Sequence, residues 1–476
     1  MNNFWKGFEK RAALKKDVEL QEHQKRVLDK LKNTNSLLLY HGLGSGKTLS
    51  SIAGTEDMKT DVVVPASLRT NYEKELNKFT TKTSPRNVMS YERATRTPLE
   101  GGQALVLDEA QRLNNPAAKR SQEIIRAAPK YQKRILLSGT PIRNNPAELA
   151  PLLRVLKPED KRVPLDSSEF NHRFIRSKTV SPGIMGRLRG IRPGITEGPK
   201  NLHILRDVLK GHVDYYEPSK EGYPSTSRGI VEVPMSDEQA DIYEYVTNNA
   251  NPVLARKVRM NLPLSRQESK QLNSFMTATR IVSNTAKPYG GKGESPKMVR
   301  AAQDLVESSK EDKNFKALVY SNYLEGGVKE YSKHLEQAGI PHTIFSGELN
   351  DKKRKEAVQA FNSGKIRALL ITGAGSEGLD LKGTKMVQIL EPHWNKARID
   401  QAVGRAIRYK SHEHLPEDER HVKVLHYHSV HPDRWYNRAL PIRRSTAADT
   451  YLHGLSEKKD ALNQQFLDVL REVGRE

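Results

Sequence analysis

A short apolar run that stops at a glycine-rich turn constrains the fold of this chain more than any other feature. The run ends at Tyr40, and the residues HGLGSGKT follow it directly. A strand that passes through such a turn into a helix is typical of a phosphate-binding loop. The backbone N–H groups from Gly44 to Lys47 would point at a phosphate, next to the positive end of the helix dipole. The stretch therefore predicts a nucleotide site.

Each position of the turn has an expected role. Lys47 would reach the β- and γ-phosphates, and the hydroxyl of Thr48 would bind Mg²⁺. The usual pattern begins with glycine, whereas this chain has His41 at that position. The glycine turn of an ordinary α/β protein would be the alternative if the motif stood alone. The predicted nucleotide-binding residues of the turn are Gly44, Ser45, Gly46, Lys47 and Thr48.

A second motif of the same kind of site lies further along the chain. The apolar stretch Ala104–Leu107 ends in the residues DEAQ. Asp108 is then placed to hold Mg²⁺, usually through water, and Glu109 to orient and deprotonate the attacking water. An Asp–Glu pair at the end of a strand is often surface charge. Its position after a phosphate loop favours the catalytic interpretation.

Length and composition limit the class of protein. With 476 residues, the chain is long enough for about three units of the usual size of about 150 residues. It has no cysteine, which excludes disulfides and thiolate metal sites. No apolar run approaches the roughly 20 residues that span a bilayer, and the first residues lack the apolar core of a signal peptide. We therefore expect an intracellular, cytoplasmic protein with no membrane partner.

The net charge of +22 favours a polyanionic partner, because release of counterions from phosphates drives such binding. Basic residues concentrate between residues 171 and 200, where prolines and glycines interrupt them. Since these residues end helices and strands, we expect a mobile basic loop there. It would contact nucleic acid or be a solvated linker. The arginines predicted to contact nucleic acid are Arg187, Arg189 and Arg192.

Strands that alternate with helical stretches predict an α/β fold with two parallel-sheet lobes. Ligands of such sheets collect at the carboxyl ends of the strands. A basic linker, a helical insertion and a C-terminal helix complete the predicted architecture. Along the C-terminal helix, we expect Leu462, Phe466, Val469 and Val473 to form an apolar stripe that docks on the core. We divide the chain into a first ATP-binding lobe at 1–165, a basic Pro/Gly-rich linker at 166–228, a second lobe at 229–440 with a helical insertion at about 236–295, and a helical tail at 441–476.

Two polar residues in the first half are further candidates. Gln24 lies on an expected opening helix from about Asn3 into Leu31, and its amide can both donate to and accept from an adenine edge. The alternative is a solvated glutamine. Ser67 follows the apolar strand Val62–Val64, where small and hydroxyl residues suit contacts with a nucleic-acid backbone.

The second half has candidate groups of its own. The residues GAGSEGLDL follow a strand and suit a close approach of the backbone to a ligand; Gly378 and Asp380 are the predicted nucleotide contacts. In QAVGRAIR, Arg405 and Arg408 are three residues apart, which predicts that they share one helical face and can reach one triphosphate. Surface ion pairs are the alternative. The catalytic interpretation is favoured because the phosphate site of the first lobe shows no such arginine, and an arginine finger contributes roughly 10³ to 10⁵ in rate.

The order of these motifs resembles the motor core of superfamily-two helicases, and within it the Swi/Snf-like ATPases. The series is LQEHQ, HGLGSGKT, VPASL, SY, DEAQ, SGTPIRNN, VYSN, FSG, GAGSEGLDL and QAVGRAIR, over about residues 18–430. The segments HVDYYEP and RYKSHEHLPEDERHVKVLHYHS resemble the helicase-like ATPases of phages and large DNA viruses. Such an origin would make the host cytoplasm the alternative location.

The resemblance implies RecA-like lobes, ATP and Mg²⁺ as cofactors, and roles for individual residues. Gln24 would contact adenine, while Gln111, in place of the more usual histidine, would couple hydrolysis to lobe movement together with Ser138–Thr140. Arg405 and Arg408 would complete the site from the second lobe. Residues that match positions along the nucleic-acid track are Ser67, Thr372 and Gly375.

These observations predict a DNA-dependent ATPase that translocates on DNA or remodels it. Duplex or branched DNA is the favoured partner, and translocation on duplex DNA or remodelling of branches is favoured over processive unwinding. The first alternative is an RNA-directed helicase that acts in transcription. The second is a nucleic-acid-binding recruitment protein in which ATP acts as a switch. The sequence does not identify a protein that recruits it.

Overall fold

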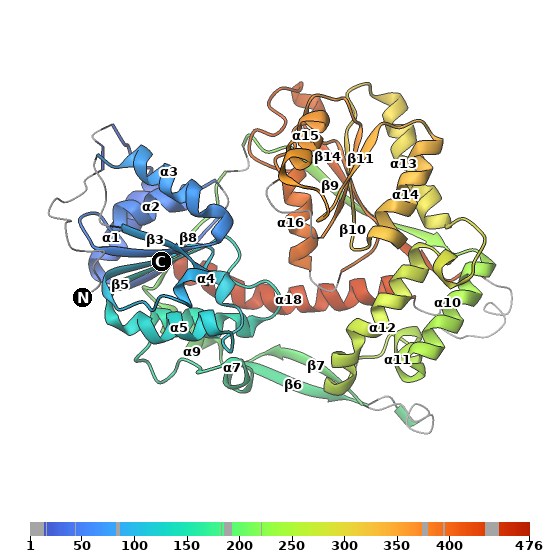
Figure 1. The fold of residues 1–476 in the computed structure, drawn as a ribbon. Coiled ribbons are helices and arrows are strands. Elements are labelled where there is room, and N and C mark those ends of the chain that lie inside the picture. The colour runs from blue at the N-terminus through green and yellow to red at the C-terminus, as the bar shows by residue number, and fades with distance from the viewer. Residues whose placement is uncertain are drawn as a thin grey trace. The chain divides into compact units, whose positions relative to one another are not determined.

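The computed structural model describes residues 14–15, 17–42, 44–81, 86–181, 183–184, 193–219, 221–373, 379–393, 396–433 and 447–476 (Figure 1). The chain divides into two compact units. The first unit comprises Met1–Ser177, Glu197–Ser219 and Lys459–Glu476, and the second comprises Lys178–Thr196 and Lys220–Lys458. A six-stranded parallel sheet forms the centre of each unit, which confirms the predicted α/β fold.

The sheet of the first unit has the strand order β3-β2-β4-β5-β1-β8. All five pairs of neighbouring strands are parallel. Helices pack on both faces of the sheet, which requires the apolar side chains that the strands carry. The phosphate loop follows β1, and DEAQ follows β4, at the same edge of the sheet. The strands are β1 Ser36–His41, β2 Thr60–Val64, β3 Arg86–Ser90, β4 Gly102–Leu107, β5 Tyr131–Ser138 and β8 Val213–Tyr216.

Successive side chains of β1 alternate between two hydrophobic cores. Leu38 and Tyr40 pack in the core that contains α5, α6 and the end of α18, whereas Leu37 and Leu39 pack in the core that contains α1, α2 and α3. The helices of this unit are α1 Glu22–Asn33, α2 Lys47–Gly54, α3 Arg69–Phe79, α4 Tyr91–Ala94, α5 Lys119–Ala127, α6 Leu149–Leu156, α7 Ser167–Phe174, α9 Leu202–Leu209 and the end of α18 Ala448–Arg475.

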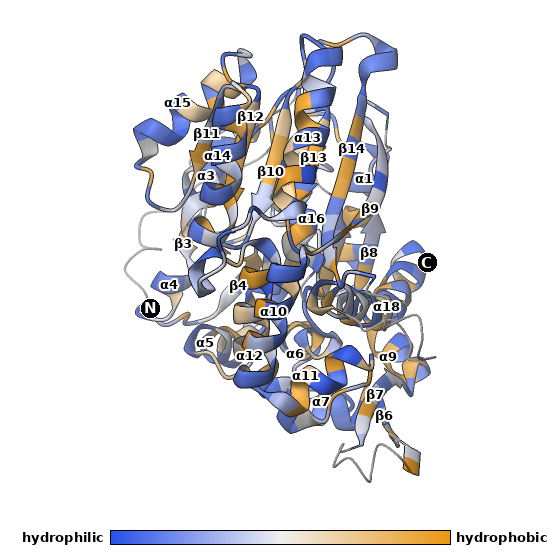
Figure 2. Ribbon diagram, turned by 90° about the vertical axis from the view of Figure 1, so that its right-hand side faces the viewer, coloured by the Kyte–Doolittle hydropathy of each residue, from blue (hydrophilic) through white to orange (hydrophobic). Residues whose placement is uncertain are grey.

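The sheet of the second unit has the order β11-β12-β10-β13-β14-β9, again parallel throughout. Its central strands are largely hydrophobic (Figure 2). The strands are β9 Ser225–Pro234, β10 Ala317–Ser321, β11 His342–Phe345, β12 Ala368–Thr372, β13 Met386–Ile389 and β14 His421–Val430. The helices are α10 Asp237–Ala250, α11 Pro252–Arg259, α12 Arg266–Asn284, α13 Pro296–Glu311, α14 Glu330–Gln337, α15 Asp351–Asn362 and α16 Lys396–Ala406.

The predicted helical insertion and C-terminal helix are both present. Helices α10, α11 and α12 form the insertion, and they share a core with the first residues of α18. Further along α18, Phe466, Val469 and Val473 are buried in the core of the first unit, and Leu462 packs against it. The apolar stripe of the tail therefore docks as its spacing predicts. Within the described ranges, every helix is too short or too polar to cross a bilayer.

Two local predictions are wrong. The helix predicted from about Asn3 into Leu31 lies partly outside the described residues, and it is not continuous, because residues 17–21 are not helical and α1 begins at Glu22. The side chain of Gln24 accepts a hydrogen bond from the backbone N–H of Gln21 and caps α1 there. Residues 171–200 were expected to form a loop, but they contain the end of α7 and a two-stranded sheet of β6 Ile175–Val180 and β7 Gly194–Pro199. The prolines and glycines lie between or at the ends of these two strands, where they are tolerated.

Arg187, Arg189 and Arg192 lie outside the described residues, as do Gly375 and Gly378. The division of the chain at residues 165, 228 and 440 stays a prediction, since compact units group residues by contact and not by independent folding.

Candidate nucleotide and nucleic-acid sites

The phosphate loop requires glycine at two positions. Gly44 and Gly46 have φ angles of 77° and 72°, in the left-handed region that other residues seldom adopt. A side chain at Gly46 would also lie 2.6 Å from Nε2 of Gln24. The loop therefore keeps its backbone close to α1, and α2 begins directly after it at Lys47.

The side chain of Lys47 binds the backbone at the start of the phosphate loop. Its ammonium group donates to the carbonyl oxygens of His41 and Gly42, each at 2.9 Å. Burial lowers the pKa of Lys47, and the carboxylates of Glu109 and Asp108 partly offset this effect. The lysine thus interacts with both the loop backbone and the acidic motif, and phosphate oxygens can replace the two carbonyl contacts.

Gln24 lies against the loop. Its Nε2 donates to the carbonyl of Gly46 at 3.3 Å, and its Oε1 accepts from the backbone N–H of Gln21 at 2.9 Å. The side chain is buried, so the alternative of a solvated glutamine is wrong. Contact with adenine stays a prediction, since both ends of the amide bind backbone groups here.

The carboxylate of Asp108 is poorly solvated. Burial raises its pKa to about 6, and the neighbouring charge of Glu109 adds to the rise. One oxygen accepts from the backbone N–H of Glu109 at 3.0 Å, and Tyr91 donates to the carbonyl of Asp108 at 2.8 Å. A divalent cation would favour the ionised form, because it supplies the charge that burial removes. The residue therefore fits a Mg²⁺ site.

Glu109 has a strained backbone. Its φ and ψ angles are 52° and 49°, a left-handed conformation that costs a non-glycine residue about 1 kcal/mol or more. Strain of this kind persists where the surrounding structure imposes it, and it concentrates at functional sites. Here the left-handed residue follows the buried end of β4, and its conformation directs the chain into the short helix Ala110–Leu113.

The side chain of Glu109 belongs to a chain of hydrogen bonds. The amide of Gln111 donates to Glu109, and its oxygen accepts from the hydroxyl of Ser138 at 2.6 Å. Ser138 in turn accepts from the backbone N–H of Thr140 at 3.1 Å. The structure thus brings together DEAQ and SGTPIRNN, which lie on the neighbouring strands β4 and β5.

Arg143 was not predicted as a site residue. Its guanidinium lies 3.8 Å from the carboxylate of Glu109, so the expectation of a phosphate site without arginine in the first lobe is wrong. The backbone N–H groups of Arg143 and Asn144 donate to the buried Glu148, which fixes this loop. The available signal was the arginine three residues after Thr140 in SGTPIRNN.

A pocket of about 460 Å³ lies within the second unit, at the carboxyl edge of its sheet. Thr372 and Gly373 border it after β12, and Ser346 and Gly347 border it after β11. Ser67 of the first unit occupies the corresponding edge of its own sheet, after β2, and is exposed. Other residues that line the pocket are Thr277, Arg280, Asn322, Tyr323, Glu348 and His393.

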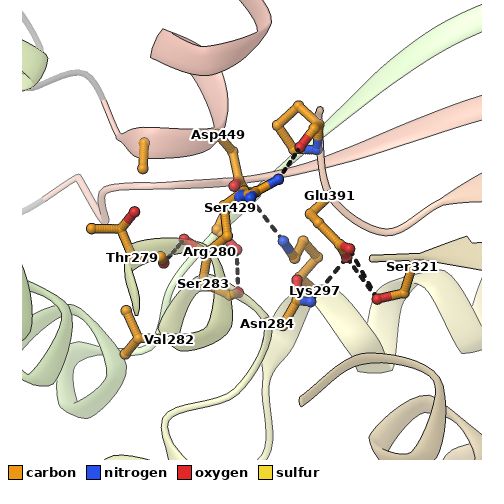
Figure 3. A network of polar contacts seen from close by, with 12 residues as sticks. Thr279, Arg280, Val282, Ser283, Asn284, Lys297, Ser321, Glu391, Ser429 and Asp449 are labelled. Carbon is orange, nitrogen blue, oxygen red and sulfur yellow. Dashed lines mark hydrogen bonds and ion pairs between the residues drawn. The ribbon is translucent and has the colours of Figure 1, made fainter. Parts of the chain in front are cut away.

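The buried Glu391 binds groups next to this pocket, and Figure 3 shows its hydrogen bonds. Its carboxylate accepts hydrogen bonds from Ser321 and from Asn284, each at 2.9 Å, and from the backbone N–H of Asn322. Arg280 donates to the carbonyl of Pro392 at 3.2 Å and to that of Met276. These contacts tie the end of β10 and the residues after β13 to α12. Neither residue was predicted, because neither belongs to a short motif.

Arg405 and Arg408 are only partly arranged as expected. Helix α16 ends at Ala406, and the backbone N–H of Arg408 donates to the hydroxyl of Ser411 instead of continuing the helix. The prediction that both lie on one helical face is therefore wrong. Arg408 forms an ion pair with Asp380 at 3.4 Å, so these two predicted site residues are close together.

Comparison with known proteins identifies the family. Two family models match the chain: the SNF2-related domain over residues 87–287, and the helicase conserved C-terminal domain over residues 297–410. The protein named "Putative ATP-dependent RNA helicase L538" of Acanthamoeba polyphaga mimivirus is 30% identical over 467 residues, which are 95% of this chain and 97% of the relative. The "Termination factor NPH-I homolog" of African swine fever virus is 25% identical, over 93% of this chain and 76% of the relative.

Among solved structures, the Sulfolobus solfataricus SWI2/SNF2 ATPase core in complex with dsDNA covers 95% of this chain and 97% of its own, with 18% identity and a TM-score of 0.35. The chain belongs to the SNF2-related family of helicase-type ATPases, and it is an ATP hydrolase.

Proposed function

We propose that this ATPase is stimulated by DNA and uses hydrolysis to translocate on duplex or branched DNA. The observation that carries the proposal is the pocket of the second unit, in which Thr372 lies at the carboxyl edge of a parallel sheet. Ser67 lies at the same kind of edge in the first unit. Small hydroxyl residues and free backbone groups at such edges suit contacts with phosphate and sugar. The net charge of +22 supplies the attraction to a polyanion.

The proposed chemistry uses the groups around the phosphate loop. Lys47 would bind the β- and γ-phosphates, and Thr48 and Asp108 would hold Mg²⁺, which neutralises charge on the phosphates. Glu109 would orient and deprotonate the attacking water. The guanidinium of Arg143 lies 3.8 Å from the carboxylate of Glu109, close enough to attract it. The remaining proposed contacts are Gln24, Gly44, Ser45 and Gly46 in the first unit, and Gly378 and Asp380 in the second.

Arg405 and Arg408 of the second unit are proposed to stabilise charge on the transferred phosphoryl group. In that case hydrolysis would depend on both units, and each cycle would move one relative to the other. The hydrogen bonds from Glu109 through Gln111 to Ser138 and Thr140 offer a route by which the state of the nucleotide reaches the rest of the first unit.

Action on RNA is the second candidate. It is favoured by the name of the relative with 30% identity, which describes an RNA helicase. The name of the other relative describes a termination factor, a role that suits either a DNA track or an RNA target. The hydroxyl and amide groups of Ser346 and Asn322 in the pocket can bind phosphates of either polymer.

Steady-state ATP hydrolysis distinguishes these functions. Wild type and Glu109→Gln would be compared without nucleic acid and with single-stranded DNA, duplex DNA, forked DNA or matched RNA, at two salt concentrations. We expect duplex or forked DNA to stimulate wild type most, less at high salt, and Glu109→Gln to remain inactive. Greater stimulation by RNA would establish the second candidate. Equal rates with and without every polymer would overturn a motor and favour an ATP-switched binding protein.

A further inference from the structure

The histidine in the phosphate loop has a specific partner. His41 is the last residue of β1, and its Nε2 lies 2.7 Å from Oδ1 of Asp214. Both side chains are fully buried. Asp214 lies in HVDYYEP, 173 residues further along the chain, on the edge strand β8 that pairs with β1. The departure from glycine at position 41 therefore coincides with a buried carboxylate on the adjacent strand.

Asp214 is held in its charged form by helix α1. Arg26 donates to both of its carboxylate oxygens, at 2.7 and 2.9 Å, and Lys30 lies 3.3 Å away. Burial alone would raise the pKa of Asp214, but hydrogen bonds from His41 and Arg26 lower it to about 2. Burial lowers the pKa of His41, so a neutral imidazole donates to a charged carboxylate. A hydrogen bond with one charged partner is among the stronger ones in proteins.

The residues after Asp214 hold the loop backbone directly. The carbonyl of Tyr216 accepts from the backbone N–H of Gly42 at 2.9 Å. A side chain at Gly42 would lie 2.6 Å from the ring of Pro218, so glycine is required for this close approach. The ring of Tyr216 stacks on His23, with centroids 3.6 Å apart and planes within 1°, and His23 donates to the carbonyl of Ser45 at 2.8 Å.

These contacts converge on Lys47. The two carbonyls that bind its ammonium group belong to His41 and Gly42, which are the residues that Asp214 and Tyr216 hold. The position of the lysine therefore depends on β8 as well as on the loop itself. A loop that is ordered before the nucleotide arrives binds it more tightly, because less conformational entropy is lost on binding.

We propose that Asp214 and Tyr216 are positioning residues that preform the phosphate loop through His41 and Gly42, and so set the affinity of the site for nucleotide. The proposal rests on the proposed role of Lys47 and the loop in binding the triphosphate. It gives the segment HVDYYEP a function in the nucleotide site, and it explains why histidine takes the place of the usual glycine.

The test is nucleotide affinity in Asp214→Asn, measured with a fluorescent mant-ADP probe and Mg²⁺, together with KM and kcat for ATP. We expect the Kd for mant-ADP and the KM for ATP each to rise about tenfold, the factor that corresponds to about 1.4 kcal/mol. The value of kcat should change less, since Asp214 does not contact the reacting atoms. An unchanged Kd in a folded variant would overturn the proposal.

Asp61→Asn is the matched control. Asp61 is also a buried aspartate on a strand of this sheet, and it binds Tyr131 and Asn87 instead of the loop. A purely structural role for Asp214 would make both variants lower the melting temperature and leave the Kd for mant-ADP alike. We expect only Asp214→Asn to raise this Kd, and an equal rise in both variants would overturn the proposal.

Substitutions of His41 test the link without altering Asp214. The amide of glutamine can replace the Nε2 donor, so we expect His41→Gln to keep near wild-type affinity and His41→Leu to lose about as much as Asp214→Asn. In His41→Leu/Asp214→Asn the losses should not multiply, because both remove one interaction. Multiplied losses, or equal affinity of the glutamine and leucine variants, would contradict the proposal.

Lys47→Ala separates this inference from the proposed function. Loss of mant-ADP binding in Lys47→Ala, with full binding in Asp214→Asn, would leave the loop as the nucleotide site and overturn only the positioning role. Full binding in Lys47→Ala would overturn the proposed site itself, and the positioning role with it.

Discussion

The side-chain amide of Gln111 donates a hydrogen bond to the carboxylate of Glu109, two residues before it. A neutral amide at this position is a donor to Glu109 and an acceptor from Ser138 at the same time, so it joins the acidic motif to SGTPIRNN on the next strand. The amide has no titratable proton, so its own donor and acceptor groups do not change with pH.

Removal of the Gln111 amide should weaken the response to nucleic acid more than nucleotide binding. In Gln111→Ala the hydroxyl of Ser138 loses its acceptor and Glu109 loses a donor. We expect the nucleic-acid-stimulated kcat to fall about tenfold, as a loss of about 1.4 kcal/mol of transition-state stabilisation gives. Stimulated kcat and mant-ADP affinity are the measurements. Gln122→Ala, an exposed glutamine of the same unit, is the control, and equal kcat in the two variants would contradict the coupling role.

Arg143 should increase the rate through its charge near Glu109. The two side chains are 3.8 Å apart and each is about 30% exposed, so solvent screens the attraction to about 1 kcal/mol. We expect Arg143→Ala to lower kcat about fivefold and Arg143→Lys to lower it less, because lysine retains the charge. Arg126→Ala removes an arginine that is 67% exposed on the same unit. If Arg126→Ala lowered kcat as much as Arg143→Ala, the contact with Glu109 would have no part in the effect.

The pKa of Asp108 predicts a pH dependence that Mg²⁺ alters. Its folded-state pKa of about 6 lies above the model-peptide value of 3.8, so protonated Asp108 stabilises the fold below about pH 4, and this contribution is lost as the pH rises through 6. Mg²⁺ and the proton compete for the carboxylate. Hydrolysis should therefore decline below about pH 6, and a higher Mg²⁺ concentration should move this decline to lower pH. A decline at one pH for all Mg²⁺ concentrations would exclude Asp108 as the titrating ligand.

The same pKa predicts a trade-off between stability and activity. Asp108→Asn removes a buried charge, so without nucleotide the variant should melt about 3 °C higher than wild type at pH 7.5, the shift expected for about 1 kcal/mol. It should also lose hydrolysis. Thermal unfolding at pH 4 is the internal control, since the stabilisation should vanish where wild-type Asp108 is protonated. A variant less stable than wild type at pH 7.5 would show that Asp108 makes favourable contacts as an ion.

Thr372 offers a test of the nucleic-acid pocket. In Thr372→Val the shape is kept and one hydroxyl is lost, which should raise the duplex DNA concentration for half-maximal stimulation about fivefold, or about 1 kcal/mol. Thr343→Val on the neighbouring strand β11 is the matched control, because Thr343 is not among the residues that line the pocket. An equal rise for both valine variants would place the effect in the stability of the sheet and not in the pocket.

The parallel sheets, the phosphate loop and DEAQ could be predicted because their signals are local. Apolar runs such as Leu37–Leu39 and Ala104–Leu107 identify buried strands, and a strand that ends in glycines and lysine has few other structures available. The stripe that includes Phe466 and Val473 likewise predicts a docked helix from its spacing alone. In each case the residues that carry the signal are neighbours in the chain or on one face of one helix.

Other features depend on contacts that a local sequence pattern does not show. Composition between residues 171 and 200 predicts a loop, yet Ile175–Val180 contains neither proline nor glycine and forms a two-stranded sheet with Gly194–Pro199. The end of α16 at Ala406 depends on the hydroxyl of Ser411, which competes with the helix for the N–H of Arg408. The spacing of apolar residues in the sequence predicts neither the strand pairing nor the competing hydrogen bond.

The order of residues was enough to predict the candidate catalytic groups: a loop with Lys47 and Thr48, and the carboxylates Asp108 and Glu109, each after its own buried strand. The surroundings of these groups depend on the fold, because they come from distant parts of the chain. Asp214 reaches His41, and Glu391 reaches Ser321, because parallel strands far apart in the chain end at one edge of a sheet. A motif records residues that are close in sequence, whereas burial and hydrogen bonding depend on residues that are close in space.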